Sequence, residues 1–231
     1  MFWTFVETTP ALGGSVQIDG KRGHHLARVL RVRPGEHGVA VFAHREYDLE
    51  VVAVDGARID ARVLTDRPAG GEASTAVTLL QAVLPNPDFD AVLEGGTAVG
   101  IRRFVAVQSA RSIGRPPAGR LTRWEAIVES AAEQSHRGEI PKVIGPVPLS
   151  SALDQASGRL LALDPGASLP LGQAIGGSAA YTIAVGPEGG WTDDELAVLR
   201  GRGAVAVNLG PRILRARLAP LVAAAILVQR P

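Results

Sequence analysis

The segments Val185-Gly-Pro-Glu-Gly-Gly190 and Leu209-Gly-Pro-Arg-Ile-Leu-Arg215 each follow a short run rich in aliphatic and β-branched residues. The runs Tyr181–Val185 and Val205–Leu209 have the length and composition of buried strands. Glycine and proline then predict a tight loop at the carboxyl end of each strand. Ligands of open α/β sheets bind at this edge. We therefore expect the two loops to come from neighbouring strands and to enclose one small molecule, although either segment alone is also compatible with a simple turn.

The chain after Thr75 alternates between strand-like and helix-like stretches, which predicts an α/β fold with a parallel sheet. Thr122 with Glu125, and Thr192 with Glu195, match the capping box that begins a helix, so helices are expected over 123–135 and 193–201. Pro220 is expected in the first turn of the last helix, where its missing N–H is tolerated. The other strands expected here are Val77–Leu84, Arg103–Val107 and Leu160–Leu163.

Residues 1–67 contain short strand-like runs separated by turn-rich pieces, a pattern typical of a small β-barrel. A single helical turn is expected at His24–Leu30, and the polar stretch Asp66–Glu72 is expected to be a linker. The chain is therefore predicted to consist of an N-terminal domain, residues 1–70, and a C-terminal domain, residues 71–231. The expected N-terminal strands are Ser15–Ile18, Gly38–Phe42, Tyr47–Val54 and Arg58–Leu64.

The composition limits the class of protein. Of the 231 residues, 46% are hydrophobic and none is cysteine, which excludes disulfides and thiolate metal sites. The N-terminus lacks the pattern of a signal peptide, and the longest apolar stretch, residues 221–228, is shorter than the roughly 20 residues that span a bilayer. We therefore expect a soluble cytoplasmic protein that makes no membrane contact.

The net charge is only +1, but stretches without acidic residues at 21–33, at 102–123 and after Glu195 are rich in arginine. Such stretches can neutralise RNA phosphates or can simply be solvated faces.

The two glycine loops together resemble the V-G-P-E-G-G and L-G-x-R-I-L-R motifs of the RsmE family, ribosomal RNA uridine-N3 methyltransferases of the SPOUT class. Gly23-His-His-Leu-Ala-Arg-Val-Leu-Arg31, Arg123-Trp124 and the stretch from Ala131 to Pro141 also resemble family motifs. The resemblance implies a PUA-like RNA-binding β-barrel in residues 1–70 and a SPOUT domain with a C-terminal trefoil knot in residues 71–231. It further implies methylation of uridine N3 in small-subunit (16S) ribosomal RNA, with S-adenosylmethionine as cofactor, an assembled 30S subunit as partner and a homodimer.

The resemblance and the strand ends together suggest site residues. Aliphatic walls suit an adenine ring, and glycines let the backbone approach a ligand. Arg215 is the candidate catalytic residue, because a permanent cation can stabilise an anionic uracil but cannot act as a base; a phosphate contact or a structural ion pair explains it equally well. The candidate cofactor-binding residues are Leu163, Val185, Gly186, Glu188, Gly190, Leu209, Gly210, Ile213 and Leu214, and the candidate RNA-binding residues are His24, His25, Arg28, Arg31, Arg123 and Arg137.

Some of these residues have simpler explanations. Glu188 is compatible with a bond to a ligand hydroxyl and with stabilisation of its own turn. Trp124 is expected in the core rather than as a platform for a base. His24 and His25 have no third ligand nearby and, being adjacent on a helix, do not face the same way, so no metal site is predicted.

The chain departs from the family pattern at charged positions. Arg217 and Leu218 stand where the family motif L-R-x-E-T-A has glutamate and threonine, and Gly95-Gly-Thr-Ala-Val-Gly100 replaces a K-x-x-E-L-G pattern. Two alternatives therefore stay open: a catalytically weakened RNA-binding or ribosome-assembly factor, and a SPOUT methyltransferase with a different RNA target. A Rossmann enzyme is disfavoured because no G-x-G-x-x-G follows the first strand of the α/β part.

Overall fold

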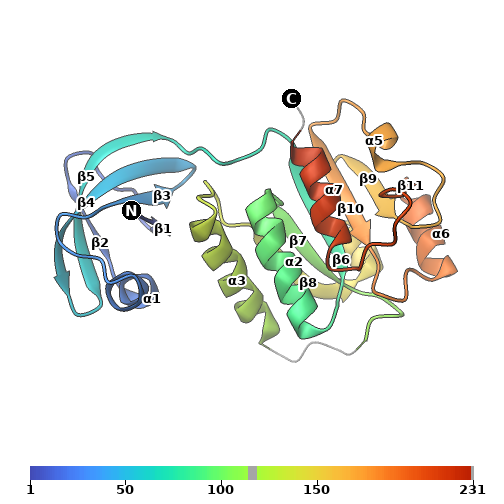
Figure 1. Ribbon diagram of the computed structural model, residues 1–231, viewed down its shortest axis with the longest axis horizontal. Helices are drawn as coiled ribbons and strands as arrows, with labels where there is room; N and C mark the ends of the chain where they lie inside the picture. Colours follow the sequence, from blue (N-terminus) through green and yellow to red (C-terminus); the bar gives the residue numbers. More distant parts are fainter. Residues whose placement is uncertain (114–118, 230–231) are drawn as a thin grey trace. The chain divides into compact units, whose positions relative to one another are not determined.

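The computed structural model describes residues 1–113 and 119–229. The chain divides into two compact units. The first comprises Met1–Glu72 together with Ala132–Glu139, and the second comprises Ala73–Ala131 together with Ile140–Pro231. Figure 1 shows the elements of both units.

The second unit contains a six-stranded sheet in the order β11-β9-β10-β6-β7-β8. Every pair of neighbouring strands is parallel, which confirms the predicted parallel α/β fold. The strands are β6 (Ala76–Ala82), β7 (Arg103–Gln108), β8 (Lys142–Pro148), β9 (Arg159–Leu163), β10 (Ala180–Val185) and β11 (Val205–Val207). The helices are α2 (Asn86–Val99), α3 (Arg120–Gln134), α4 (Leu149–Leu153), α5 (Leu171–Ala174), α6 (Asp193–Gly201) and α7 (Ala219–Val228).

Helices cover both faces of this sheet (Figure 1). Successive side chains of a strand point to opposite faces, so each face carries apolar side chains that pack against helices. On β6, Leu79 packs into the core beneath α2, α3, α5 and α7, whereas Leu80 packs into the core beneath α4 and α6. Trp124 is fully buried in the first of these cores, as expected. Among the described residues, no helix has both the length and the apolar character of a membrane span.

One helix prediction in this unit needs correction. The helix expected from Thr122 begins at Arg120, so Thr122 lies inside α3 rather than at its start. Helix α2 occupies one of the helix-like stretches that the sequence places between strands without giving bounds, although Pro87, Gly95 and Gly96 are turn signals. A Cβ at Gly96 would lie 2.8 Å from a ring carbon of Phe104, so glycine is needed where α2 packs closely on β7. The capping box of Thr192 and Glu195 and the position of Pro220 in the first turn of α7 are confirmed.

The first unit contains a five-stranded sheet in the order β1-β3-β4-β5-β2, in which β1 and β3 are parallel and the other pairs are antiparallel. An apolar cluster that includes Leu26, Leu49 and Ile59 fills its interior. All four predicted strands are present, and the sequence missed β1. The elements are β1 (Phe2–Phe5), β2 (Ser15–Ile18), α1 (Gly20–His24), the single-turn π-helix η1 (His25–Val29), β3 (His37–Phe42), β4 (Arg45–Asp55) and β5 (Arg58–Pro68).

Two local expectations in this unit also change. Helical structure begins at Gly20 rather than His24, because Gly23 continues the helix while lying against Ala57; a Cβ there would lie 2.1 Å from the Ala57 carbonyl oxygen. Strand β5 extends to Pro68 and covers the first part of the expected linker, since residues up to Pro68 pair with β4.

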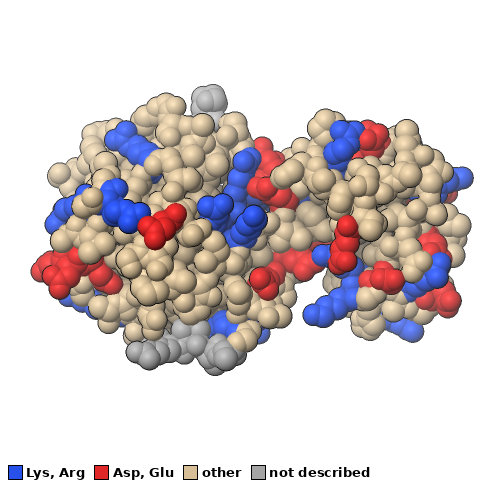
Figure 2. Space-filling view, turned by 180° about the vertical axis from the view of Figure 1, so that it is seen from behind, with Lys and Arg blue, Asp and Glu red and all other residues tan. Residues whose placement is uncertain are grey.

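Charges of both signs are interspersed over the face shown in Figure 2. Several arginines from the arginine-rich stretches have partners within their own unit: Arg102 donates to the Ala73 carbonyl at 2.7 Å, and Arg202 pairs with Asp154 at 2.9 Å. Arg115 and Arg230 of these stretches lie outside the described residues. Part of the arginine content therefore makes contacts within the protein itself.

Candidate cofactor and RNA sites

A pocket of about 510 Å³ lies at the carboxyl ends of strands in the second unit. It is lined by the loops that follow β9, β10 and β11, and by Asp88 in the first turn of α2. This is the edge where the sequence places the ligand site. However, β9 lies between β10 and β11, so the expectation that the two glycine loops follow neighbouring strands is wrong. The loop of the middle strand contributes Asp164 and Pro165 to the pocket.

Every residue that the sequence assigns to the cofactor lines this one pocket, and so does Arg215. Leu163 and Val185 form buried walls at the ends of their strands, whereas Ile213 is 85% exposed at the mouth. The volume lies within the roughly 300–1,000 Å³ typical of small-molecule sites. The sequence did not name Asp88, Trp191, Asn208 and Arg212, which also line the pocket. Trp191 directly follows the first glycine motif and Arg212 lies within the second, so the motifs could have indicated both. Asp88 lies far from both motifs in the sequence, and no pattern there indicated it.

The glycines of the β10 loop have distinct roles. The Gly190 N–H donates to the Pro187 carbonyl at 2.8 Å and closes the turn, and Gly190 has a φ of +69°. A Cβ at Gly186 would lie 3.1 Å from the Trp191 backbone nitrogen, so a side chain there would push the two ends of the loop apart by a few tenths of an ångström. Gly210, in the β11 loop, has a φ of +97°. Both loops therefore depend on glycine for their shape.

Glu195 connects the β10 loop to the loop that follows β7 through hydrogen bonds. One carboxylate oxygen accepts the Thr192 N–H at 2.9 Å, and the other accepts the Ala110 N–H at 2.9 Å. Burial by itself would raise the pKa of Glu195, but these hydrogen bonds outweigh it, and the pKa lies below its ordinary value of 4.5. Arg111 adds a second connection by donating to the Gly189 carbonyl at 2.8 Å. The sequence predicted the helix cap but not this bridge.

Three charged side chains stand exposed at the pocket mouth: Glu188, Arg212 and Arg215. Within the described part of the chain, none of the three forms an ion pair or a side-chain hydrogen bond. Glu188 therefore does not stabilise its own turn, which favours its interpretation as a ligand group. Likewise, Arg215 is not held in a structural ion pair with any described residue.

The β11 loop is anchored at its start by Asn208. The Asn208 carbonyl accepts the Leu171 N–H at 2.8 Å, its N–H donates to Leu169 at 2.9 Å, and its side-chain amide donates to Ala167 at 2.8 Å. These partners belong to the segment that follows β9. Asn208 thereby joins the two segments that form one side of the pocket.

Most of the candidate RNA-binding residues are exposed. His24, His25, Arg28 and Arg31 form an exposed group on or just after α1 and η1 in the first unit. In the second unit, Arg123 projects from α3 with 64% of its side chain exposed and pairs with Asp90 at 2.6 Å, a hydrogen bond that raises its pKa. The exposed group on α1 and η1 is therefore accessible to a phosphate backbone.

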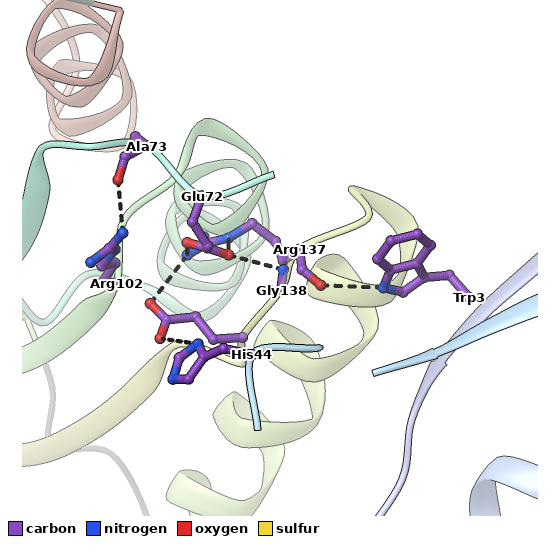
Figure 3. Close-up of polar contacts among 8 residues, drawn as sticks. Trp3, His44, Glu72, Ala73, Arg102, Arg137 and Gly138 are labelled. Atoms are coloured by element: carbon purple, nitrogen blue, oxygen red, sulfur yellow. Dashed lines mark hydrogen bonds and ion pairs between the residues drawn. The ribbon is translucent and has the colours of Figure 1, made fainter. Parts of the chain in front are cut away.

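Arg137 is a correction, because its side chain is only 2% exposed. Its Nε and Nη2 donate to the two carboxylate oxygens of Glu72 at 2.8 and 2.7 Å (Figure 3). The Gly138 N–H donates to the same carboxylate at 3.0 Å, and the Trp3 indole N–H donates to the Arg137 carbonyl at 3.2 Å. Arg137 thus holds the segment 132–139 within the first unit and does not present its charge to RNA.

Comparison with known proteins places the chain in a family. The model of the RNA methyltransferase domain family matches residues 71–228. Ribosomal RNA small subunit methyltransferase E of Mycobacterium bovis is 36% identical over 235 residues, which cover 95% of this chain and 88% of that protein. The chain belongs to the RsmE family. An RsmE protein from Synechocystis is 34% identical over 209 residues, covering 87% of this chain and 69% of that protein.

A solved RsmE structure supports the fold. The crystal structure of ribosomal RNA small subunit methyltransferase E from Neisseria gonorrhoeae, bound to S-adenosyl methionine, has a TM-score of 0.91 to this chain. The sequences are 32% identical, and the match covers 97% of this chain and 95% of that one. The RNA methyltransferase match, residues 71–228, includes every residue that lines the pocket.

Proposed function

We propose that this chain is an S-adenosylmethionine-dependent methyltransferase that modifies N3 of a uridine in 16S ribosomal RNA. The observation that carries the proposal is the pocket, because it unites both glycine loops with Arg215 at the carboxyl edge of the sheet. The relatives' names, which specify the small-subunit ribosomal RNA, support the substrate. The S-adenosyl methionine bound to the Neisseria relative supports the cofactor, and the RsmE motifs imply uridine N3.

The pocket fits this cofactor chemically. Leu163, Val185, Leu209 and Leu214 supply apolar walls for an adenine ring, and backbone groups of the glycine loops supply hydrogen bonds. Glu188, exposed at the mouth, can accept a bond from a ribose hydroxyl. When bound, S-adenosylmethionine supplies a methyl group on a positively charged sulfur. The chain therefore needs mainly to position the reacting groups and exclude water.

Arg215 has the chemistry to assist the uracil. N3 of uridine is a weak acid and becomes nucleophilic as its proton leaves, which places negative charge on the uracil carbonyl oxygens. A permanently protonated guanidinium beside those oxygens stabilises that charge. S-adenosylmethionine held in this pocket would supply the methyl group and leave as S-adenosylhomocysteine, and the N3 proton would pass to solvent.

The exposed group of His24, His25, Arg28 and Arg31 would bind RNA phosphates. Contacts to phosphates give affinity and register without reading sequence. We extend the proposal to an assembled 30S subunit as substrate, since a large folded RNA can contact this group while its target base occupies the pocket. Such a partner implies a cytoplasmic enzyme.

The trefoil knot, the PUA-like barrel and the homodimer are further parts of this proposal. The hydrogen bonds of Asn208 to the segment after β9, followed by the return of the chain to α7 against β6 and β10, are compatible with a knot. The mixed five-stranded sheet around one apolar core is compatible with a PUA-like barrel. Leu218 and Ile226 are 46% and 41% exposed and are available for a dimer contact.

The decisive experiment uses methyl-labelled S-adenosylmethionine and 30S subunits that lack the modification, followed by nuclease digestion and mass spectrometry. The expected result is label on N3 of a single uridine, with little label when naked 16S RNA replaces the subunit. Label on another base or another RNA would contradict the proposed target. No label, from a folded protein that binds the cofactor, would favour a binding-only assembly factor instead.

A further inference from the structure

Arg217, which stands where the resemblance expects a glutamate, has a partner in the pocket wall. Its Nη1 donates to Asp88 Oδ1 at 2.9 Å, and the side chains of Arg217 and Asp88 are 49% and 31% exposed. Asp88 lines the pocket from the first turn of α2, and Arg217 lies two residues before α7. The reversed charge at position 217 therefore meets an acidic group rather than standing alone.

The contact lies at the C-terminal end of the β11 loop, which has fewer hydrogen bonds to other segments than its start. The start of this loop is anchored by Asn208, whereas at its end the Arg215 carbonyl accepts the N–H groups of Leu218 and Ala219, bonds within the segment itself. Among described residues, no other polar side-chain contact joins residues 209–218 to a different element. The span between Asn208 and Arg217 includes Arg212 and Arg215, the exposed cations at the mouth.

We propose that Asp88 and Arg217 form a positioning pair for the β11 loop. The ion pair holds the end of the loop against α2, and it neutralises a carboxylate that would otherwise attract Arg215 and repel RNA phosphates. The proposal rests on the proposed function of the pocket. Because a partly exposed ion pair contributes little to folding stability, its effect appears in ligand affinity and turnover. The departure from the family motif at position 217 thus places a cation where Asp88 can pair with it.

A charge-reversal cycle tests the pair. D88R and R217E each place two like charges together, and D88R/R217E restores an ion pair of opposite polarity. The Kd of S-adenosylhomocysteine is measured by calorimetry, and KM and kcat by methyl transfer. Each single variant is expected to raise Kd about tenfold, and the double variant to return to within about twofold of the parent value.

The pair of Arg202 and Asp154 provides a matched control, since it has the same 2.9 Å separation, is also partly exposed and lies in the same unit outside the pocket. R202E is expected to change the melting temperature as little as R217E does and to leave Kd unchanged. A double variant that binds as weakly as the singles would overturn the positioning role, as would R217E with unchanged Kd and kcat. If the parent chain itself fails to bind S-adenosylhomocysteine, the proposed function is wrong and the pair loses its role with it.

Discussion

At the scale of single residues, Gly210 has a backbone conformation that other residues adopt only with strain, since its φ is +97°. Gly210→Val would introduce about 1–3 kcal/mol of strain, because β-branched side chains fit poorly in this region. The loop can relieve the strain by moving, which displaces Leu209 and Leu214 from the pocket wall. We expect the Kd of S-adenosylhomocysteine, measured by calorimetry, to rise about tenfold or more.

Gly203 offers a control for Gly210. It has a φ of +80°, and at both glycines an added Cβ would meet no atom within 4 Å. Gly203 follows α6 and does not line the pocket. Gly203→Val should therefore lower the melting temperature as Gly210→Val does, but leave the Kd unchanged. Equal losses of affinity in the two variants would show that general destabilisation, not loop shape, controls binding.

Arg215 is expected to act in the chemical step. Arg215→Ala should lower kcat by about a hundredfold, the effect typical of removing one group that stabilises developing charge. The Kd of S-adenosylhomocysteine should stay nearly constant, because the side chain is exposed at the mouth. Methyl transfer is measured across RNA and salt concentrations. A higher KM for RNA with a reduced salt dependence, at unchanged kcat, would instead identify Arg215 as a phosphate contact.

At the scale of secondary-structure elements, prediction succeeded where local chemistry alone determines the outcome. The aliphatic runs became β9, β10 and β11, and Thr192 caps α6 through its own neighbours. It gave no bounds for α2, where distant packing overrides local signals. Gly96 reads as a helix breaker, yet it is the residue that lets α2 approach Phe104 on β7. Local rules contain no information about that approach.

The Glu195 carboxylate accepts hydrogen bonds both from Thr192 at the start of α6 and from Ala110 in the loop after β7. Its ionisation should therefore affect the free energy of unfolding. Its folded-state pKa lies below the ordinary 4.5, and its contribution is therefore present above that pH and lost as the pH falls through the folded-state pKa. E195Q should lower the free energy of unfolding by about 1 kcal/mol at pH 7. Urea unfolding from pH 7 to pH 3 should show the two proteins converging under acid. A constant difference across this range would mean that the carboxylate charge has no role.

At the scale of the whole molecule, the sequence predicted ten of the 21 residues that line the pocket, but it predicted none of the long-range ion pairs. The glycine motifs carry their own loop geometry, so the residues around them could be named in advance. Asp88 and Arg217 are 129 positions apart, and Glu72 and Arg137 are 65 positions apart. Only the fold brings these charges together. For the same reason, the sequence assigned Arg137 to RNA although its guanidinium is buried.

Arg137 is expected to determine stability rather than RNA affinity. Arg137→Met leaves Glu72 as a carboxylate without its bidentate partner, and removing one member of a buried pair typically costs about 3–5 kcal/mol. The Trp3 indole donates to the Arg137 carbonyl, so Trp3 fluorescence reports this region once Trp124 and Trp191 are replaced by phenylalanine. Urea titration followed by this signal should show a markedly lower midpoint for Arg137→Met.

The double variant Glu72→Met/Arg137→Met separates a structural role from an RNA contact. Replacing both members of a buried ion pair by apolar side chains of similar volume is often nearly neutral for stability, so the double variant should recover much of the lost free energy of unfolding. Its affinity for 30S subunits should then equal that of the parent chain, since the Arg137 side chain is only 2% exposed and pairs with Glu72. Arg28→Ala, which removes an exposed cation, should weaken binding without changing stability. A stable double variant with weakened 30S binding would return Arg137 to the RNA surface and overturn this assignment.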